Sequence, residues 1–229
     1  MKTIVIIPAY NEEESIGKVI EDIPKDLVSE IIVVNNNSTD DTENVALNSG
    51  ATVLFEQFKG YGAACLKGID YLKDKHPDTI VFLDGDYSDY PEELSELIRL
   101  IDKENYDFVL GSRVLGESEK GSLPLQSRFG SLIAGTLINL FWKFKYTDLG
   151  PFRAIKYNKL IQLDMKDKWF GWTVEMQIKA VKKKFRIIEI PVRYRKRIGK
   201  SKVTGTIKGT LMASIIIMKT ILTQAFNNK

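Results

Sequence analysis

The sequence of 229 residues contains a single cysteine, Cys65, and a single histidine, His76. A disulfide needs two cysteines and a structural zinc site needs several Cys or His ligands, so both are excluded. Excess charge is also small, because 33 Lys and Arg face 30 Asp and Glu for a formal net charge of +3. This balance does not indicate nucleic-acid binding. Because the lone cysteine excludes a disulfide framework, we expect a reducing, cytoplasmic setting.

Long hydrophobic runs are absent as well. The most apolar stretch lies near the C-terminus, where Lys208 and Lys219 leave ten uncharged residues between them. A membrane-spanning helix requires about twice that number, roughly 20. The apolar run before Pro8 is short and is followed by acids, so we expect a first strand there and not a signal peptide. Segment 205–229 is expected to form an amphipathic helix on a membrane surface, a partner subunit or its own core.

Apolar, β-branched segments alternate with helical patterns in the first half of the chain. Segments 3–7, 30–34 and 79–83 have the composition of buried parallel strands. Residues 51–55 form a further short strand in this interpretation. The order predicts an α/β fold with a doubly wound, mainly parallel sheet flanked by helices, and a ligand site at the carboxyl ends of its strands. We assign this domain to residues 1–204.

Two carboxylates, Asp84 and Asp86, directly follow the third predicted strand. Such an Asp-X-Asp (DxD) pair at a strand end can hold Mg²⁺ or Mn²⁺ while the ion bridges a diphosphate. A short acidic pair is more often a solvated turn or a helix cap. Its position after a buried strand and before a helix that opens at Pro91 favours the metal site.

The ends of the first two strands carry polar side chains suited to a nucleoside. Tyr10 can stack on a base and Glu12 can accept a hydrogen bond from a base or ribose, although both also fit an ordinary helix start. Asn35 and Asn36 offer amide donors and acceptors. Glycine patterns typical of dinucleotide-binding and phosphate-loop folds are missing from this part of the sequence.

Jointly, these segments resemble family 2 glycosyltransferases of the GT-A fold, most closely the branch of dolichyl-phosphate mannose synthase and other polyprenyl-phosphate glycosyltransferases. The resemblance extends from about Thr3 to Gly209. The segments that carry it occur in the family's order: IPAYNE, VNNNSTDDT, GYGAACLKGI, FLDGDYSDYPEEL, GSR, TDLGPFRAI, GWTVEMQIKA and RKRIGKSKVTGT. It implies an inverting, metal-dependent hexosyltransferase that uses a UDP-, GDP- or dTDP-linked sugar.

The resemblance also implies residue roles on the donor side. Asp84 and Asp86 match the carboxylates that bind the metal and the diphosphate. Ser88 stands where the mannose synthases carry a metal-coordinating glutamine, and the family usually has Asp at one or both of positions 35 and 36, so a third ligand and the usual nucleotide contact stay open. The residues expected to bind the donor nucleotide are Pro8, Tyr10, Glu12, Asn35, Asn36, Gly62, Asp84 and Asp86.

Catalytic roles are implied for Asp86, Arg113 and Glu175. Arg113 resembles the strand-end arginine that reaches toward phosphate. Glu175 is the best placed general base if the acceptor is a hydroxyl, whereas an ionised lipid phosphate needs no base and Glu175 would then orient other groups. Trp172 is interpreted either as a sugar-stacking residue or as core.

The basic end of the sequence is expected to hold phosphates. Between Lys179 and Lys208, twelve basic residues accompany one acid. The resemblance implies that a flexible basic loop lies near the diphosphate, and a solvated basic face attracted to anionic lipid is the alternative. The residues expected to contact phosphate or acceptor are Arg113, Arg128, Arg197, Ser201 and Lys202.

The sequence therefore predicts sugar transfer to an acceptor for which a polyprenyl phosphate is favoured. Two alternatives stay open: transfer to a hydroxyl in cell-envelope glycan synthesis, and a non-catalytic nucleotide-sugar-binding subunit of a membrane complex. We expect a peripheral protein at the cytoplasmic face of a membrane, with no nucleic-acid partner and with a homodimer as an open possibility.

Overall fold

The structure is a computed structural model that describes residues 1–199, 201 and 207–226. Lys202 and the predicted domain boundary after residue 204 lie outside the described residues. The strands are β1 (Thr3–Ala9), β2 (Glu30–Asn35), β3 (Thr52–Phe55), β4 (Thr79–Phe82), β5 (Phe108–Ser112), β6 (Arg153–Lys156) and β7 (Ile187–Pro191). The helices are α1 (Ile16–Asp22), α2 (Thr42–Asn48), α3 (Tyr61–Tyr71), the 3₁₀ turn η1 (Pro91–Glu93), α4 (Leu94–Asp102), α5 (Leu125–Trp142), α6 (Tyr157–Leu163), α7 (Trp172–Lys182) and α8 (Ile207–Phe226).

The strands form one sheet in the order β3-β2-β1-β4-β6-β5-β7. Strand β1 pairs in parallel with β2 and β4, and β2 pairs in parallel with β3. The predicted α/β class and mainly parallel sheet are confirmed. Because Ala9 lies opposite Asn35 and Ile6 lies opposite Phe82, the motifs that follow β1, β2 and β4 all leave the sheet at the same edge.

Strand β6 is the antiparallel member of the sheet, since it runs antiparallel to both β4 and β5. We did not predict it, because its four residues follow Pro151 and Phe152 and resemble a loop motif in the sequence. Arg153 at its start is fully buried. Its guanidinium donates to the carbonyls of Gly150, Pro151 and Thr173, which ties the segment before β6 to the start of α7.

Two apolar cores cover the faces of the sheet. Alternate residues of β1 point to opposite sides, with Ile4 and Ile6 in one core and Val5 and Ile7 in the other. Helices α1, α2 and α4 cover the second core, and α3, α5, α6, α7 and α8 cover the first. Helix α2 ends just before Gly50, whose φ of +85° suits a glycine after a helix C-terminus.

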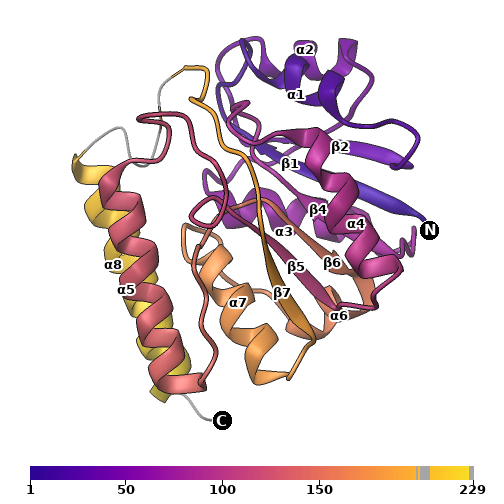
Figure 1. Ribbon diagram of the computed structural model, residues 1–229. Coiled ribbons are helices and arrows are strands. Elements are labelled where there is room, and N and C mark those ends of the chain that lie inside the picture. The colour runs from indigo at the N-terminus through magenta and orange to yellow at the C-terminus, as the bar shows by residue number, and fades with distance from the viewer. Residues whose placement is uncertain (200, 202–206, 227–229) are drawn as a thin grey trace.

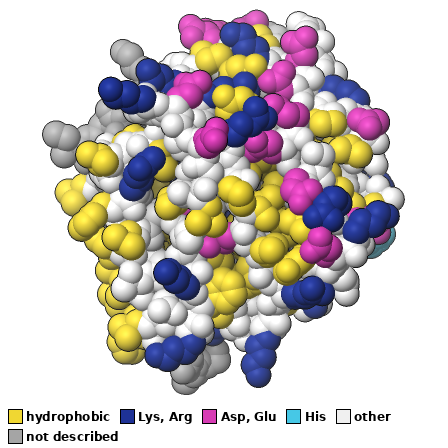
Figure 2. Space-filling view, in the orientation of Figure 1, with side chains coloured by type: hydrophobic (Ala, Val, Ile, Leu, Met, Phe, Trp, Pro, Cys, Tyr) yellow, Lys and Arg dark blue, Asp and Glu magenta, His cyan; other side chains and the backbone are white. Residues whose placement is uncertain are grey.

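Helices α5 and α8 lie side by side at the left of Figure 1, and both contact α7. Ile221 of α8 is fully buried in the core, whereas the outer faces of both helices carry exposed apolar side chains. These gather along the left edge of Figure 2. We call them the apolar face: Leu125, Phe129, Leu132, Ile133, Leu140 and Phe141 of α5, with Leu211, Met212, Ile215, Leu222 and Phe226 of α8. None of the helices in the described part of the chain combines the length and hydropathy that crossing a bilayer requires.

Candidate active site

A cavity of about 330 Å³ opens at the edge where β1, β2 and β4 end. We call it the sheet-edge pocket. It collects residues from five of the sequence motifs, which are distant along the chain. Its lining consists of Pro8, Ala9, Tyr10, Glu12, Asn36, Lys59, Gly60, Tyr61, Asp84, Gly85, Asp86, Trp169, Phe170, Arg197 and Ser201.

Asp84 and Asp86 both line this pocket, but they differ in their hydrogen-bond partners. Asp86 accepts hydrogen bonds at Oδ1 from the Ser88 hydroxyl and from the Ser88 backbone N–H, the latter at 3.0 Å. Oδ1 of Asp84 is buried and has no hydrogen-bond partner in the described part of the chain. Burial and the nearby charge of Asp86 raise the pKa of Asp84 well above its usual range.

Asp89 lies close to these two carboxylates, and we did not predict it. It is 1% exposed, and within residues 1–199, 201 and 207–226 neither carboxylate oxygen has a hydrogen-bond partner. Burial and then Asp86 raise its pKa to about 7. In the sequence, Asp89 precedes Pro91 and resembles an ordinary helix cap, so only the fold shows that it belongs to the acidic cluster.

Arg197 crosses the sheet-edge pocket. Its guanidinium donates to Glu12 Oε1 at 2.8 Å and forms an ion pair with Asp86 Oδ2 at 2.9 Å. The segment that carries it is fixed on the DxD turn, because Ile198 N–H donates to the Asp86 carbonyl. The basic segment expected near the carboxylates is therefore there, with Ser201 in the same lining.

The acidic cluster fits a divalent cation. Within the described residues, no three His, Cys, Asp or Glu side chains form a ready-made metal site. Mg²⁺ is commonly held by one or two carboxylates together with substrate phosphates and water. The unpaired oxygen of Asp84 and the oriented carboxylate of Asp86 suit that mode of binding.

The residues expected to bind a nucleoside divide into two groups. Pro8, Tyr10 and Glu12 line the pocket, and the Tyr10 hydroxyl accepts a hydrogen bond from Lys59 at 3.0 Å. The two asparagines instead hold loops, since the Asn35 amide donates to Glu43 and Asn36 accepts from Gly60 N–H. Asn36 lies in the lining, and Asn35 does not.

Glu175, which we expected to act as a general base, does not line the sheet-edge pocket. It is 4% exposed, its carboxylate accepts the backbone N–H groups of Lys166 and Asp167, and it pairs with Lys179 at 2.6 Å. It holds the segment that continues to Trp169, a pocket residue. Trp172 is fully buried against Phe82 and does not face a pocket.

Gly62 also contacts this segment and not the pocket. A Cβ on Gly62 would lie 2.1 Å from the Asp167 carbonyl oxygen, and one on Gly60 would lie 2.2 Å from that of Lys168. The glycines are needed because another backbone approaches α3 there, whereas we had expected a close approach of the nucleotide. The approach places Trp169 and Phe170 in the lining, two residues that the motifs did not indicate.

A second cavity, of about 230 Å³, lies between α5, α8 and the sheet. We call it the α5–α8 pocket, and it adjoins the sheet-edge pocket because Tyr61, Asp84 and Phe170 line both. Its other lining residues are Arg113, Gln126, Ser127, Gly130, Ser131, Leu149, Pro151, Thr173, Ala213, Ser214 and Ile217.

Arg113 lines this second pocket as a fixed cation. Its guanidinium makes a forked ion pair with Asp148, with Nε to Oδ2 at 2.7 Å and Nη2 to Oδ1 at 2.8 Å. Ser131 also donates to Asp148. Despite burial, Arg113 lowers the pKa of Asp148 to about 2. Arg128, expected nearby, is exposed on α5 and is not part of the lining.

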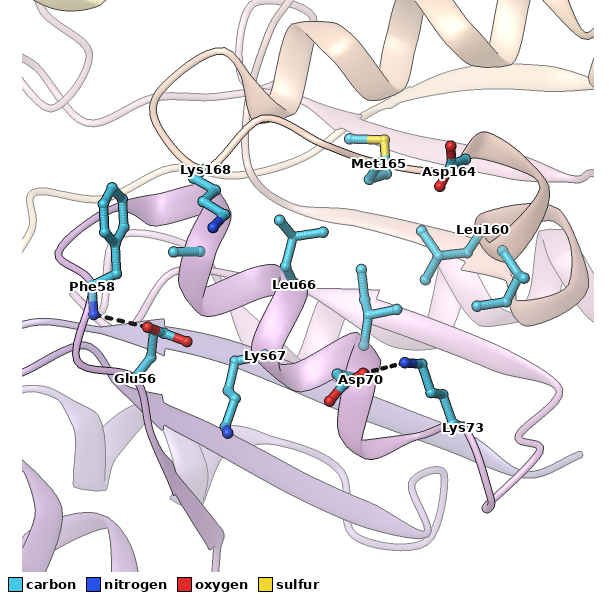
Figure 3. Close-up of a pocket in the computed structure, with 13 residues that line it drawn as sticks. Glu56, Phe58, Leu66, Lys67, Asp70, Lys73, Leu160, Asp164, Met165 and Lys168 are labelled. Carbon is cyan, nitrogen blue, oxygen red and sulfur yellow. Dashed lines mark hydrogen bonds and ion pairs between the residues drawn. The ribbon is translucent and has the colours of Figure 1, made fainter.

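A third cavity, of about 590 Å³, is a separate groove between α3 and α6 (Figure 3). Leu66, Leu160 and Met165 lie along it, and Phe58 and Lys168 close one end (Figure 3). Two of its charged groups, Asp70 and Lys73, form an ion pair. It contains none of the residues that the sequence motifs predicted.

Comparison with known proteins accords with this geometry. Residues 4–163 match the family model "Glycosyl transferase family 2". An uncharacterized glycosyltransferase of Mycobacterium tuberculosis is 33% identical over 220 residues, which cover 95% of this chain and 96% of the relative. The undecaprenyl-phosphate mannosyltransferase of Micrococcus luteus is 27% identical over 94% of this chain and 93% of its own. A solved structure of glucosyl-3-phosphoglycerate synthase from M. tuberculosis, in complex with Mn²⁺, UDP and glucosyl-3-phosphoglycerate, matches with a TM-score of 0.76 at 22% identity and covers 98% of this chain and 80% of that one.

Proposed function

Because the chain belongs to glycosyl transferase family 2, we propose that it transfers a hexosyl group from a nucleotide diphosphate sugar to the phosphate of a polyprenyl lipid, with inversion at the anomeric carbon. The observation that carries the proposal is the pair of adjoining pockets, one lined by Asp84 and Asp86 and the other by Arg113. A donor in the first pocket faces an acceptor in the second. The acceptor oxygen bonds to the anomeric carbon, and the bond to the diphosphate breaks with its electron pair on the departing oxygen.

The sheet-edge pocket is the donor site in this proposal. Asp84 and Asp86 hold Mg²⁺ or Mn²⁺, which supplies positive charge against the leaving diphosphate. The solved synthase from M. tuberculosis, whose description includes Mn²⁺ and UDP, supports this assignment. Arg197 lies beside Asp86 and can offer its guanidinium to diphosphate oxygens in forked contacts. Tyr10 lies where a nucleobase can stack.

A phosphate acceptor fits the second pocket better than a hydroxyl. Arg113 provides a partly buried cation there, and a phosphate that is already ionised needs no general base. The Glu175 carboxylate, expected to act as base on a hydroxyl, is occupied by two backbone N–H groups and Lys179. The name of the M. luteus relative, an undecaprenyl-phosphate mannosyltransferase, supports a lipid phosphate.

The apolar face is the proposed contact with the membrane. It lies on α5 and α8, the helices that frame the α5–α8 pocket, so a lipid chain can remain in the bilayer while its phosphate reaches Arg113. Exposed Arg128 lies among the apolar residues of α5 and suits the anionic headgroups of a cytoplasmic leaflet. The proposal is peripheral attachment at that face.

The test is a turnover screen of the purified protein against UDP-glucose, UDP-N-acetylglucosamine, GDP-mannose and dTDP-glucose, with Mg²⁺ or Mn²⁺ and undecaprenyl phosphate in detergent. Metal-dependent formation of a glycosyl lipid phosphate from one donor is the expected result, and Asp86→Ala should abolish it. Binding of a donor without any turnover would favour the non-catalytic subunit instead. Turnover with hydroxyl acceptors alone would move the assignment to glycan synthesis.

A further inference from the structure

Three side chains belong to the lining of both pockets: Tyr61, Asp84 and Phe170. Under the proposed function, the transferred sugar is the group that leaves one pocket and bonds to the occupant of the other. These three side chains therefore surround the place where the sugar must lie. Of the three, Phe170 is apolar and Asp84 belongs to the metal-binding pair, which leaves Tyr61 as a polar residue with no assigned role.

Tyr61 is held in place from two directions. Its ring packs edge-to-face on Trp172, with centroids 6.0 Å apart and an interplanar angle of 65°. Trp172 is itself fully buried and packs on Phe82 at 4.9 Å. Tyr61 is also the first residue of α3, and the N–H of the next residue, Gly62, donates to the Trp169 carbonyl. The position of the Tyr61 hydroxyl is therefore set before any ligand arrives.

That hydroxyl is buried, and in the described part of the chain no nitrogen or oxygen atom bonds to it. Its hydrogen-bonding neighbour is the buried thiol of Cys65, and a thiol is only a weak donor and acceptor. Native structures keep few buried polar atoms without a good partner. Tyr61 lines the junction of the two pockets, so a bound ligand can give its hydroxyl a stronger partner than the thiol.

The chemistry of the phenol restricts that ligand. Its hydroxyl can both donate and accept a hydrogen bond. A sugar hydroxyl can do the same and carries no charge, whereas an alkyl chain offers no partner. The anionic groups of donor and acceptor are already assigned to the metal-binding carboxylates and to Arg113.

We propose that Tyr61 binds the transferred sugar, with its Oη hydrogen-bonded to a ring hydroxyl of the hexose at the junction of the two pockets. The bond fixes the ring so that the anomeric carbon faces the α5–α8 pocket. Tyr61 thereby selects donors that carry a hydroxyl at that ring position. The inference rests on the proposed function and adds a residue that recognises the sugar and not the nucleotide.

The test compares Tyr61→Phe with Tyr71→Phe, a matched change at the other end of α3. The Tyr71 hydroxyl donates to Glu30 at 3.0 Å and lies in neither pocket. We expect Tyr61→Phe to lower kcat/KM for the accepted donor about tenfold and to leave the Kd of the free nucleoside diphosphate within twofold. Tyr71→Phe should leave both quantities unchanged.

Deoxy analogues of the accepted donor sharpen the test. One analogue should lose about tenfold in kcat/KM with the wild-type protein and nothing further with Tyr61→Phe, because the two changes remove the same bond. In urea, Tyr61→Phe should unfold close to the wild-type midpoint, since it removes only a weak contact with the Cys65 thiol, whereas Tyr71→Phe should unfold earlier.

The outcomes separate the two proposals. Unchanged kcat/KM in Tyr61→Phe, with an active wild-type protein, overturns the role of Tyr61 and leaves the proposed function standing. Equal weakening of sugar nucleotide and free nucleoside diphosphate also overturns it, because the residue would then act on the nucleotide. A wild-type protein that transfers no sugar from any donor of the screen overturns both.

Discussion

The two pockets place charge in opposite ways. The sheet-edge pocket is lined by three carboxylates, Glu12, Asp84 and Asp86, and Asp84 keeps an unpaired oxygen in the described part of the chain. In the α5–α8 pocket, Arg113 and Asp148 satisfy one another in a forked pair, with Ser131 as a further donor. In the first pocket the carboxylates outnumber the cations Lys59 and Arg197, so a bound metal ion can balance them, and the second holds the cation Arg113 already in position. Under the proposed function, the same fold separates a site for a metal-bound diphosphate from a site for an anion.

The largest expected effect follows from removing the charge of Asp84 in the sheet-edge pocket. Asp84→Asn keeps the shape of the side chain and removes its charge, so turnover should fall by about 100- to 1,000-fold or more. The folded state should not lose stability, because Asp84 Oδ1 has no partner to lose. Steady-state kinetics and urea unfolding measure the two quantities. Asp70→Asn, an exposed carboxylate of α3, is the control, and equal activity of both variants would contradict the donor assignment.

The next effect tests the fixed cation of the other pocket. Arg113→Lys keeps the charge and loses the fork, so KM for the lipid phosphate should rise about 10- to 100-fold. Hydrolysis of the donor without acceptor should stay within twofold. Arg99→Lys is a matched control, since Arg99 makes a similar fork to Glu96 on an exposed helix. Slower donor hydrolysis with unchanged acceptor KM would reverse the assignment of the pockets.

A smaller effect concerns the apolar face. The double variant Phe129→Ser, Leu132→Ser removes two side chains that are 64% and 62% exposed, so binding to phosphatidylglycerol vesicles should weaken at least about tenfold without loss of fold. Leu47→Ser with Ile161→Ser removes two exposed apolar residues from α2 and α6 and should leave binding unchanged. Point changes are preferable to truncating α8, because Ile221 belongs to the core. Unchanged vesicle binding with a lower sedimentation mass would indicate a homodimer contact instead.

The smallest effect is on stability at low pH. The pKa of Asp148 is lowered from 3.8 to about 2, so its ionised form stabilises the fold above pH 4 and that contribution is lost as the pH falls toward 2. The shift corresponds to about 2 kcal/mol. The free energy of unfolding in urea, measured from pH 6 to pH 2.5, should fall more steeply for the wild-type protein than for Asp148→Asn. Parallel curves would show that the pair contributes no such linkage.

The sequence predicted the parts of the fold and site that depend on local pattern. Strands β1, β2 and β4 follow from their β-branched runs, and the parallel order brings Tyr10, Glu12 and Asp86 to one edge. Strand β6 was missed because four residues with a charge at each end carry no clear period. Its antiparallel direction depends on pairing with β4 and β5, which are distant in sequence.

The missed site residues depend on contacts across the chain. Nothing in the sequence shows that Asp148 binds Arg113 or that Glu175 holds the backbone of Lys166 and Asp167, because those partners are set by tertiary packing. Asp89 resembles a helix cap in the sequence, and only the fold shows that it is buried and that its backbone pairs with Tyr194. The roles assigned to Asp84, Asp86 and Arg197 in donor binding stay predictions that the variants above test.

The width of the sheet-edge pocket depends on two glycines, which have no side chain. Gly60 and Gly62 let the backbone of residues 167 and 168 touch the start of α3, and Trp169 and Phe170 follow directly in the lining. An alanine at either position would push that backbone outward and carry both aromatic rings with it. The dimensions of the cavity are therefore encoded by residues that present no functional group, so donor preference can change through substitutions that never touch the sugar or the nucleotide.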